Sequence, residues 1–159
     1  MRDIELLERP FVNVYFQFCE QEARKSLCLR KKGGSIIVND EGVILGTGFN
    51  GPPGNTRLER CLKDGIPKNF KSDRTCCMHA EQRAIIDALS KHSNLSETTI
   101  YYLGLDLENR RLFAGRPYCT ICSKLALDVG IKEFVLWHEE GIVAYDTREY
   151  NELSFAFRS

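Results

Sequence analysis

Apolar residues recur at two different periods along the chain, and the change from one period to the other marks the expected elements. A spacing of three to four residues, with charged residues in between, predicts a helix over residues 11–29. The apolar side of this helix would consist of Phe11, Tyr15, Phe18, Ala23 and Leu27. Gly33 and Gly34 interrupt the pattern, so the helix is expected to end before them.

Runs of β-branched, aliphatic and aromatic residues predict the strands. The first two runs are separated by the turn residues 39–42 and are expected to form a hairpin. Residues 141–145 are either a short strand or part of a turn. The other expected strands are residues 35–38, 43–49, 98–105 and 133–137.

Three further helices are expected at residues 79–89, 119–129 and 146–155, the second ending near Gly130. Glycine and proline pairs predict a loop at residues 50–55. The polar residues 56–75 and 107–116 are expected to be a surface excursion and a connection. The alternation of strands and helices predicts an α/β protein, a three-layer α/β/α sandwich with a mixed sheet of about five strands. We expect residues 1–159 to form a single domain.

Charge and composition narrow the kind of partner. Lys plus Arg and Asp plus Glu number 22 each, whereas proteins that bind polynucleotides usually carry a basic excess. No apolar run approaches the roughly 20 residues of a membrane span, and the acidic start is unlike a secretory leader. We therefore expect a cytoplasmic protein that acts on a small molecule. In a reducing compartment, its seven cysteines are expected to be metal ligands or buried thiols.

Two short clusters bring together residue types that bind transition metals. His79-Ala-Glu81 and Cys119-Thr-Ile-Cys122 each stand at the start of an expected helix. One histidine and two cysteines leave the fourth tetrahedral position of zinc to water, as in catalytic rather than structural sites. The partial positive charge of the two helix N-termini helps to keep the thiols deprotonated. The clusters therefore predict a catalytic zinc site.

Glu81 stands two residues after His79, so it can lie beside the metal without being a ligand. Zinc lowers the pKa of bound water to about 7, and a neighbouring carboxylate can carry protons to a ring nitrogen and a leaving amine. His-x-Glu followed by Pro-Cys-x-x-Cys is the signature of the zinc nucleobase deaminases. Tyr118 is inserted between Pro117 and Cys119 but leaves the cysteine spacing intact. The combination predicts hydrolytic deamination.

The chain resembles the cytidine and deoxycytidylate deaminase superfamily, and within it the deoxycytidylate (dCMP) deaminase branch. Residues 46–53, 79–85 and 119–131 carry the resemblance. It implies a cytidine deaminase-type fold, a homo-oligomer, and conversion of dCMP to dUMP with release of ammonia. It implies that His79, Cys119 and Cys122 bind zinc and that Glu81 shuttles protons.

The resemblance also implies substrate contacts from Asn50 and from the backbone of Ala80. Two departures leave the substrate open, because Arg83 stands where the branch usually has Asn and Phe49 where it usually has Tyr. A phosphate would need a cation, and Arg116 is preferred because it lies just before the cysteine pair. The candidate cations are Arg30, Arg83, Arg111 and Arg116.

The remaining cysteines have two interpretations. Cys19 and Cys28 are expected to be buried as small apolar side chains of the first helix. Some members of the branch carry a second, structural zinc, which Cys61 with Cys76 or Cys77 could hold, although ordinary thiols are the simpler expectation.

Other functions remain open from the sequence. The substrate could be another amino-heterocycle, namely cytidine, cytosine, guanine or a biosynthetic intermediate. A base in transfer RNA or single-stranded DNA is disfavoured by the balanced charge. A non-catalytic zinc-binding subunit would have no chemical need for Glu81.

Overall fold

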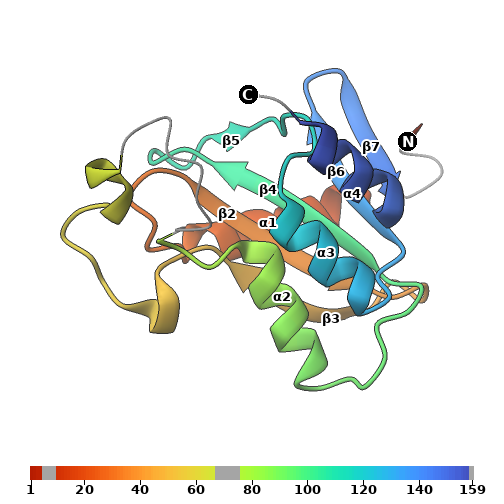
Figure 1. Ribbon diagram of the computed structural model, residues 1–159. Helices are drawn as coiled ribbons and strands as arrows, with labels where there is room; N and C mark the ends of the chain where they lie inside the picture. The colour runs from red at the N-terminus through yellow and green to blue at the C-terminus, as the bar shows by residue number, and fades with distance from the viewer. Residues whose placement is uncertain (5–9, 67–75, 158–159) are drawn as a thin grey trace.

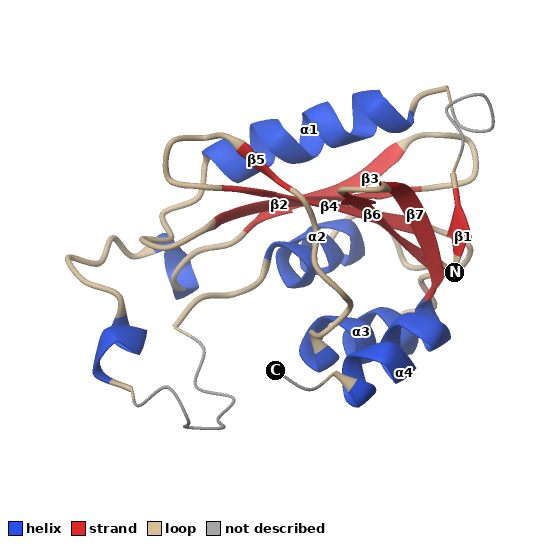
Figure 2. Ribbon diagram, turned by 90° about the horizontal axis from the view of Figure 1, so that it is seen from above, coloured by secondary structure: helices blue, strands red, loops and turns tan. Residues whose placement is uncertain are grey.

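The computed structural model of the protein describes residues 1–4, 10–66 and 76–157. One sheet of seven strands runs through the molecule, with helices on both faces (Figures 1 and 2). Residues 67–75 of the expected surface excursion lie outside the described residues. The strands are β1 (Arg2–Asp3), β2 (Lys32–Val38), β3 (Ile44–Phe49), β4 (Thr99–Leu105), β5 (Arg111–Leu112), β6 (Glu133–His138) and β7 (Gly141–Asp146).

The sheet is mixed, as expected. Its order is β1-β7-β6-β4-β2-β3, and β5 pairs with β4. Only β4 and β6 run parallel among these pairs, and the β2–β3 and β6–β7 hairpins are antiparallel. The five longer strands match the expectation, including β7, for which a turn was the alternative. β1 and β5 were missed because two residues are too short to show a period.

Four α-helices complete the three layers. α1 covers one face of the sheet, and α2, α3 and α4 cover the other (Figure 2). In the part of the chain that the structure describes, no helix is long and apolar enough to cross a membrane. The helices are α1 (Val12–Arg24), α2 (Ala80–Leu89), α3 (Thr120–Asp128) and α4 (Thr147–Ala156), with 3₁₀ turns at Pro53–Asn55 and Leu62–Gly65.

The hydrophobic core lies in two parts, one on each side of the sheet. Successive residues of a strand point to opposite faces. In β2, Ile36 and Val38 therefore pack in the cluster under α1, whereas Ile37 packs in the cluster with α2. In β4, Tyr101 likewise packs in the cluster under α1 and Ile100 in the cluster with α2.

The expected apolar side of the first helix was wrong by one position at Phe11, Tyr15 and Phe18, whereas Ala23 is buried as expected. Val12, Phe16, Cys19 and Ala23 are buried against the sheet, while Phe11 and Phe18 are 63% and 40% exposed. Three successive turns each carry two adjacent apolar residues, namely 11 and 12, 15 and 16, and 18 and 19. The spacing alone therefore fits either of two apolar faces of the helix. The helix also ends at Arg24, five residues earlier than expected.

Gly33 and Gly34 belong to β2 rather than to a break before it. A Cβ atom at Gly34 would lie only 1.9 Å from the carbonyl oxygen of Cys19. The glycine therefore allows α1 to approach the sheet backbone closely, which accounts for its place inside a strand.

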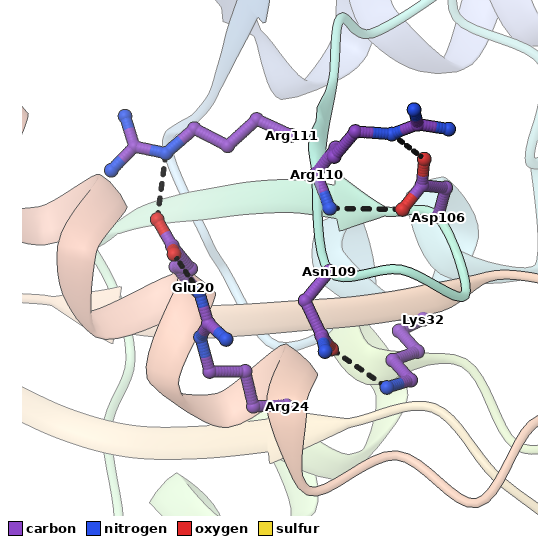
Figure 3. A network of polar contacts seen from close by, with 7 residues as sticks. All are labelled: Glu20, Arg24, Lys32, Asp106, Asn109, Arg110 and Arg111. Carbon is purple, nitrogen blue, oxygen red and sulfur yellow. Dashed lines mark hydrogen bonds and ion pairs between the residues drawn. The ribbon is translucent and has the colours of Figure 1, made fainter.

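Polar contacts hold the expected connection 107–116 against β2 and α1. Lys32 Nζ donates to Asn109 Oδ1 at 2.7 Å, and Arg111 Nε donates to Glu20 Oε2 at 2.7 Å (Figure 3). The connection thus contains the short strand β5 and is anchored at two points.

Candidate active site and metal centre

The first metal-ligating cluster is placed by the start of α2. His79 is the N-cap residue of this helix, and its backbone N–H donates to Gln82 Oε1 at 3.0 Å. Ala80 and Glu81 follow as the first two helical residues, and both are buried. Met78 pairs with Gly51 through two backbone hydrogen bonds of 2.9 and 3.2 Å, which fix the chain just before His79.

The second cluster is placed by the start of α3. Cys119 is its N-cap residue, and the backbone N–H of Cys122 donates to Cys119 Sγ at 3.4 Å. The helix therefore begins at Thr120, one residue later than expected, because Cys119 has the extended backbone of a cap. This geometry turns both sulfur atoms toward His79.

The three expected ligands meet at one point. Cys119 Sγ and Cys122 Sγ lie 3.2 and 3.3 Å from His79 Nδ1. Among the residues that the structure describes, only this group brings three such ligand atoms within 4.8 Å of one another. One nitrogen and two sulfur donors fit a tetrahedral zinc ion with an open fourth position.

The two thiols of the centre shift in opposite directions, because the hydrogen bond with Cys119, followed by burial, raises the pKa of Cys122. The neighbouring thiol of Cys122, followed by the imidazole of His79, lowers the pKa of Cys119 to about 4, although burial acts in the opposite direction. A thiolate at neutral pH is the form that binds zinc. Burial raises the pKa of Glu81, and the imidazole of His79 partly offsets this. A carboxyl group with a raised pKa is suited to taking up and releasing protons.

A pocket of about 220 Å³ opens beside these groups. His79, Ala80, Glu81 and Cys119 line it, while Cys122 is buried behind. Other residues expected to contact the substrate, Asn50 and Arg116, also line the pocket. The lining further includes Lys31, Tyr102, Leu136, Tyr118 and Tyr150.

Asn50 is held by the protein itself. Its Oδ1 accepts hydrogen bonds from the backbone N–H of Gly33 and from Ser26 Oγ, both at 2.7 Å. Its Nδ2 donates to the carbonyl oxygen of Lys31 at 2.8 Å. Only the second Nδ2 hydrogen is left for a ligand, so the side chain mainly joins two segments of the pocket wall.

Of the four candidate arginines, two line the pocket and two do not. Arg116 is exposed at the edge of the pocket, and Arg30 lines the pocket while pairing with Asp64. Arg83 and Arg111 are outside the lining. Arg83 binds the loop after β3, donating to the carbonyl oxygens of Pro52 and Gly51 at 2.7 and 3.2 Å.

Sequence reasoning missed several polar groups of the pocket wall, among them Lys31, Tyr102 and Tyr150. Lys31 precedes β2, Tyr102 belongs to β4, and Tyr150 belongs to α4, so nothing local connects them with the zinc motifs. The alternation in β4 was the available signal for Tyr102, because it places this residue on the same face as Ile100.

The remaining cysteines divide between the core and the pocket. Cys19 is fully buried in the core, as expected, but Cys28 is only partly buried and lines the pocket. Cys61 Sγ lies 3.7 Å from Cys76 Sγ, which lies 3.8 Å from Cys77 Sγ. The second zinc therefore stays a prediction, now with Cys28 near its expected ligands, since Cys28 interacts with Cys77.

Known proteins resemble this chain in fold. The dCMP deaminase of the cyanophage S-TIM5 in its apo form is 22% identical, with a TM-score of 0.53 over 79% of this chain and 81% of that one. A structure of the phage enzyme in complex with dCMP and dUMP is 20% identical, with a TM-score of 0.51 over 84% and 82%. A mutant cytidine deaminase from Mycobacterium tuberculosis is 17% identical, with a TM-score of 0.50 over 82% and 87%. These likenesses confirm the cytidine deaminase-type fold.

No curated protein matches the chain in sequence. The family described as the cytidine and deoxycytidylate deaminase zinc-binding region, however, matches residues 12–138. This stretch includes most of the chain and all residues of the metal centre. The chain therefore belongs to the cytidine and deoxycytidylate deaminase family.

Proposed function

We propose that the protein hydrolytically deaminates an amino-pyrimidine nucleotide, with dCMP as the preferred substrate and dUMP and ammonia as products. The observation that carries the proposal is the meeting of His79, Cys119 and Cys122 beside the buried carboxyl group of Glu81 at one pocket. The family and the fold of the neighbouring structures support the same chemistry.

His79, Cys119 and Cys122 would hold the zinc ion. When bound, zinc would supply Lewis acidity that makes water a nucleophile near neutral pH. In the proposed reaction the water oxygen adds to C4 of the cytosine ring, and the amino group leaves as ammonia. The rest of the reaction depends on proton transfers by the protein.

Glu81 would make these transfers. Its carboxylate would accept a proton from the attacking water and deliver it to the ring nitrogen N3. It would then take the proton of the hydroxyl group added at C4 and give it to the departing amine, which leaves as ammonia. Burial raises the pKa of this carboxyl group, which favours its uptake of a proton. Glu81 therefore acts as base and acid in succession.

The pocket walls would hold the ring in place. Ala80 is the first residue of α2, where backbone N–H groups have no acceptor inside the helix, so its N–H can donate to the ring carbonyl. Asn50 would offer its remaining amide hydrogen to the sugar. Tyr118, whose ring lies 5.8 Å from that of Phe157, stands at the open side of the pocket. Arg116 would contribute positive charge for a phosphate.

An ammonia-release assay tests the proposed function. The substrates are cytosine, cytidine, deoxycytidine, CMP, dCMP and guanine, and dCMP is expected to have the highest kcat/KM. Glu81→Gln is expected to lower kcat by about 10²–10⁴-fold while zinc content stays unchanged. Release from nucleosides but not from monophosphates would contradict dCMP as substrate. Unchanged turnover in Glu81→Gln would refute the role of this carboxyl group.

The compartment and assembly are part of the proposal. None of the seven cysteines forms a disulfide, which supports a reducing cytoplasm. Phe11, Val14 and Phe18 leave apolar surface exposed on α1, which supports a homo-oligomer. Light scattering during size-exclusion chromatography tests the assembly, and a mass of 18.2 kDa would show a monomer.

A further inference from the structure

Lys31 reaches the pocket across a glycine of the neighbouring strand. A Cβ atom at Gly104 in β4 would lie 2.6 Å from Lys31 Cε and 3.2 Å from its Nζ. The absence of a side chain at Gly104 therefore leaves the room that the Lys31 side chain occupies. The backbone of Lys31 is fixed as well, because its carbonyl oxygen accepts the 2.8 Å hydrogen bond from Asn50.

The ammonium group of Lys31 makes no hydrogen bond or ion pair with another residue of 1–4, 10–66 and 76–157, although it lies within electrostatic range of Glu81. Its two neighbours in sequence are paired, Arg30 with Asp64 and Lys32 with Asn109. Burial lowers the pKa of Lys31, and the negative charge of Glu81 only partly offsets this. A partly buried cation without a hydrogen-bond acceptor is unfavourable, so the group is better satisfied by an anion from outside the protein.

The charge of the pocket points the same way. Among the residues that the structure describes, four basic residues and a single carboxylate line it. The carboxylate is Glu81, which the proposed chemistry already uses. Lys31 is the least exposed of the basic residues, since Arg30, Lys63 and Arg116 are all exposed.

We propose that Lys31 is a specificity-determining residue that binds the phosphate of a pyrimidine nucleoside monophosphate. The inference rests on the proposed function, because it places the phosphate of that substrate next to Lys31. A charge-assisted hydrogen bond from Nζ to a phosphate oxygen favours the monophosphate over the nucleoside. Lys31 thus acts in binding, whereas Glu81 acts in the chemical step.

Calorimetric binding of dUMP and deoxyuridine to the zinc-loaded protein tests the inference. The quantity compared is the ratio of the two dissociation constants in the unmodified protein, Lys31→Met, Lys31→Arg and Lys124→Met. Lys124 is exposed on α3 outside the pocket lining, so its replacement removes the same charge elsewhere. Since no reaction occurs, binding is measured independently of turnover.

The unmodified protein is expected to bind dUMP at least tenfold more tightly than deoxyuridine. Lys31→Met is expected to lower this preference by about 10–100-fold or abolish it, because hydrogen bonds to charged groups contribute that much. Lys31→Arg should keep most of the preference for dUMP over deoxyuridine, and Lys124→Met should keep all of it. A preference for dUMP that survives in Lys31→Met would overturn the inference, as would its absence from the unmodified protein.

The failures of the two proposals can be told apart. Ammonia release from cytosine nucleosides without any effect of the phosphate would leave the deaminase intact and remove the role of Lys31. A Lys31-dependent preference for dUMP without ammonia release from any cytosine compound would support the anion site and refute the proposed deaminase.

Discussion

The guanidinium of Arg83 lies over the ring of Phe49, with its Cζ atom 5.1 Å from the ring centroid. The sequence differs at both positions from the usual pattern of the dCMP deaminase branch that it resembles, so these two differences are neighbours in space. The same guanidinium donates to Asn55 Oδ1 at 2.7 Å and to two backbone carbonyl groups of the loop. Arg83 therefore joins α2 to the loop that follows β3.

Replacing Arg83 should loosen this loop. Arg83→Met removes three hydrogen bonds and leaves partly buried carbonyl groups, so we expect a loss of about 2 kcal/mol in the free energy of unfolding. Thermal unfolding should show a melting temperature lower by about 4–8 °C. Arg57→Met, at an exposed position nearby, is the control and should change it little. Equal melting temperatures for the two variants would contradict this role.

The metal centre was predictable because its geometry is local. His79 and Glu81 are two residues apart, Cys119 and Cys122 span one helical turn, and each pair needs only a helix start. That the two pairs meet in space was then implied by the resemblance to the cytidine and deoxycytidylate deaminase superfamily. A pattern that is complete within a few residues can be recognised without knowledge of the fold.

Lys31 and Arg83 were not predictable in the same way. The partners of Arg83 are 28 to 32 residues away, and the space for Lys31 depends on Gly104 in another strand. The buried side of α1 was also misread, because Phe11 and Val12 are equally apolar and only the sheet selects Val12. Such choices are made by tertiary packing, which leaves no local period in the sequence.

Gly48 sets the distance between β3 and the helix of the metal centre. A Cβ atom there would lie 2.3 Å from the carbonyl oxygen of Ala80 and 2.4 Å from the backbone nitrogen of Ala84. Gly48→Ala must therefore push α2 away from β3. We expect the free energy of unfolding, measured with urea, to fall by about 3 kcal/mol. Gly65→Ala is the matched control, since no atom of the described residues lies within 4 Å of its added Cβ. Comparable stability of the two variants would disprove the close approach.

Glu20 should make the stability depend on pH. Hydrogen bonding from Arg24, together with that from Arg111, holds the pKa of Glu20 below its ordinary value of 4.5, against the effect of burial (Figure 3). A carboxyl group with a lowered folded-state pKa stabilises the protein above the unfolded pKa, and this contribution disappears as the pH falls through the folded value. Glu20→Gln should therefore cost roughly 1 kcal/mol at pH 7 and less below pH 4.5.

Urea unfolding of the unmodified protein and Glu20→Gln at pH 7 and at acidic pH measures this difference. Glu152→Gln, an exposed change on α4, controls for the general effect of removing one negative charge. A cost of Glu20→Gln that is the same at both pH values would show that the ion pairs with Arg24 and Arg111 do not contribute.

Zinc should be lost when one of its expected ligands is removed. Cys119→Ser replaces a sulfur donor at the centre where Cys119 Sγ lies 3.2 Å from His79 Nδ1. Elemental analysis is expected to give at least one zinc per chain for the unmodified protein and one fewer for Cys119→Ser. Chelation of the metal should also lower the melting temperature, because a ligand that binds only the folded state stabilises it.

The same measurement separates the metal centre from the neighbouring cysteines. The sulfur atoms of Cys61 and Cys76 are 3.7 Å apart, so Cys61→Ser tests the alternative of a second, structural zinc. If zinc binds only at the metal centre, Cys61→Ser will keep the full zinc content. A second zinc would be lost from Cys61→Ser and retained in Cys119→Ser.

Undiminished zinc in Cys119→Ser, with full retention after dialysis against chelator-free buffer, would rule out Cys119 as a ligand. Since serine has almost the size of cysteine, the loss of metal then reports the donor atom rather than a disturbed fold.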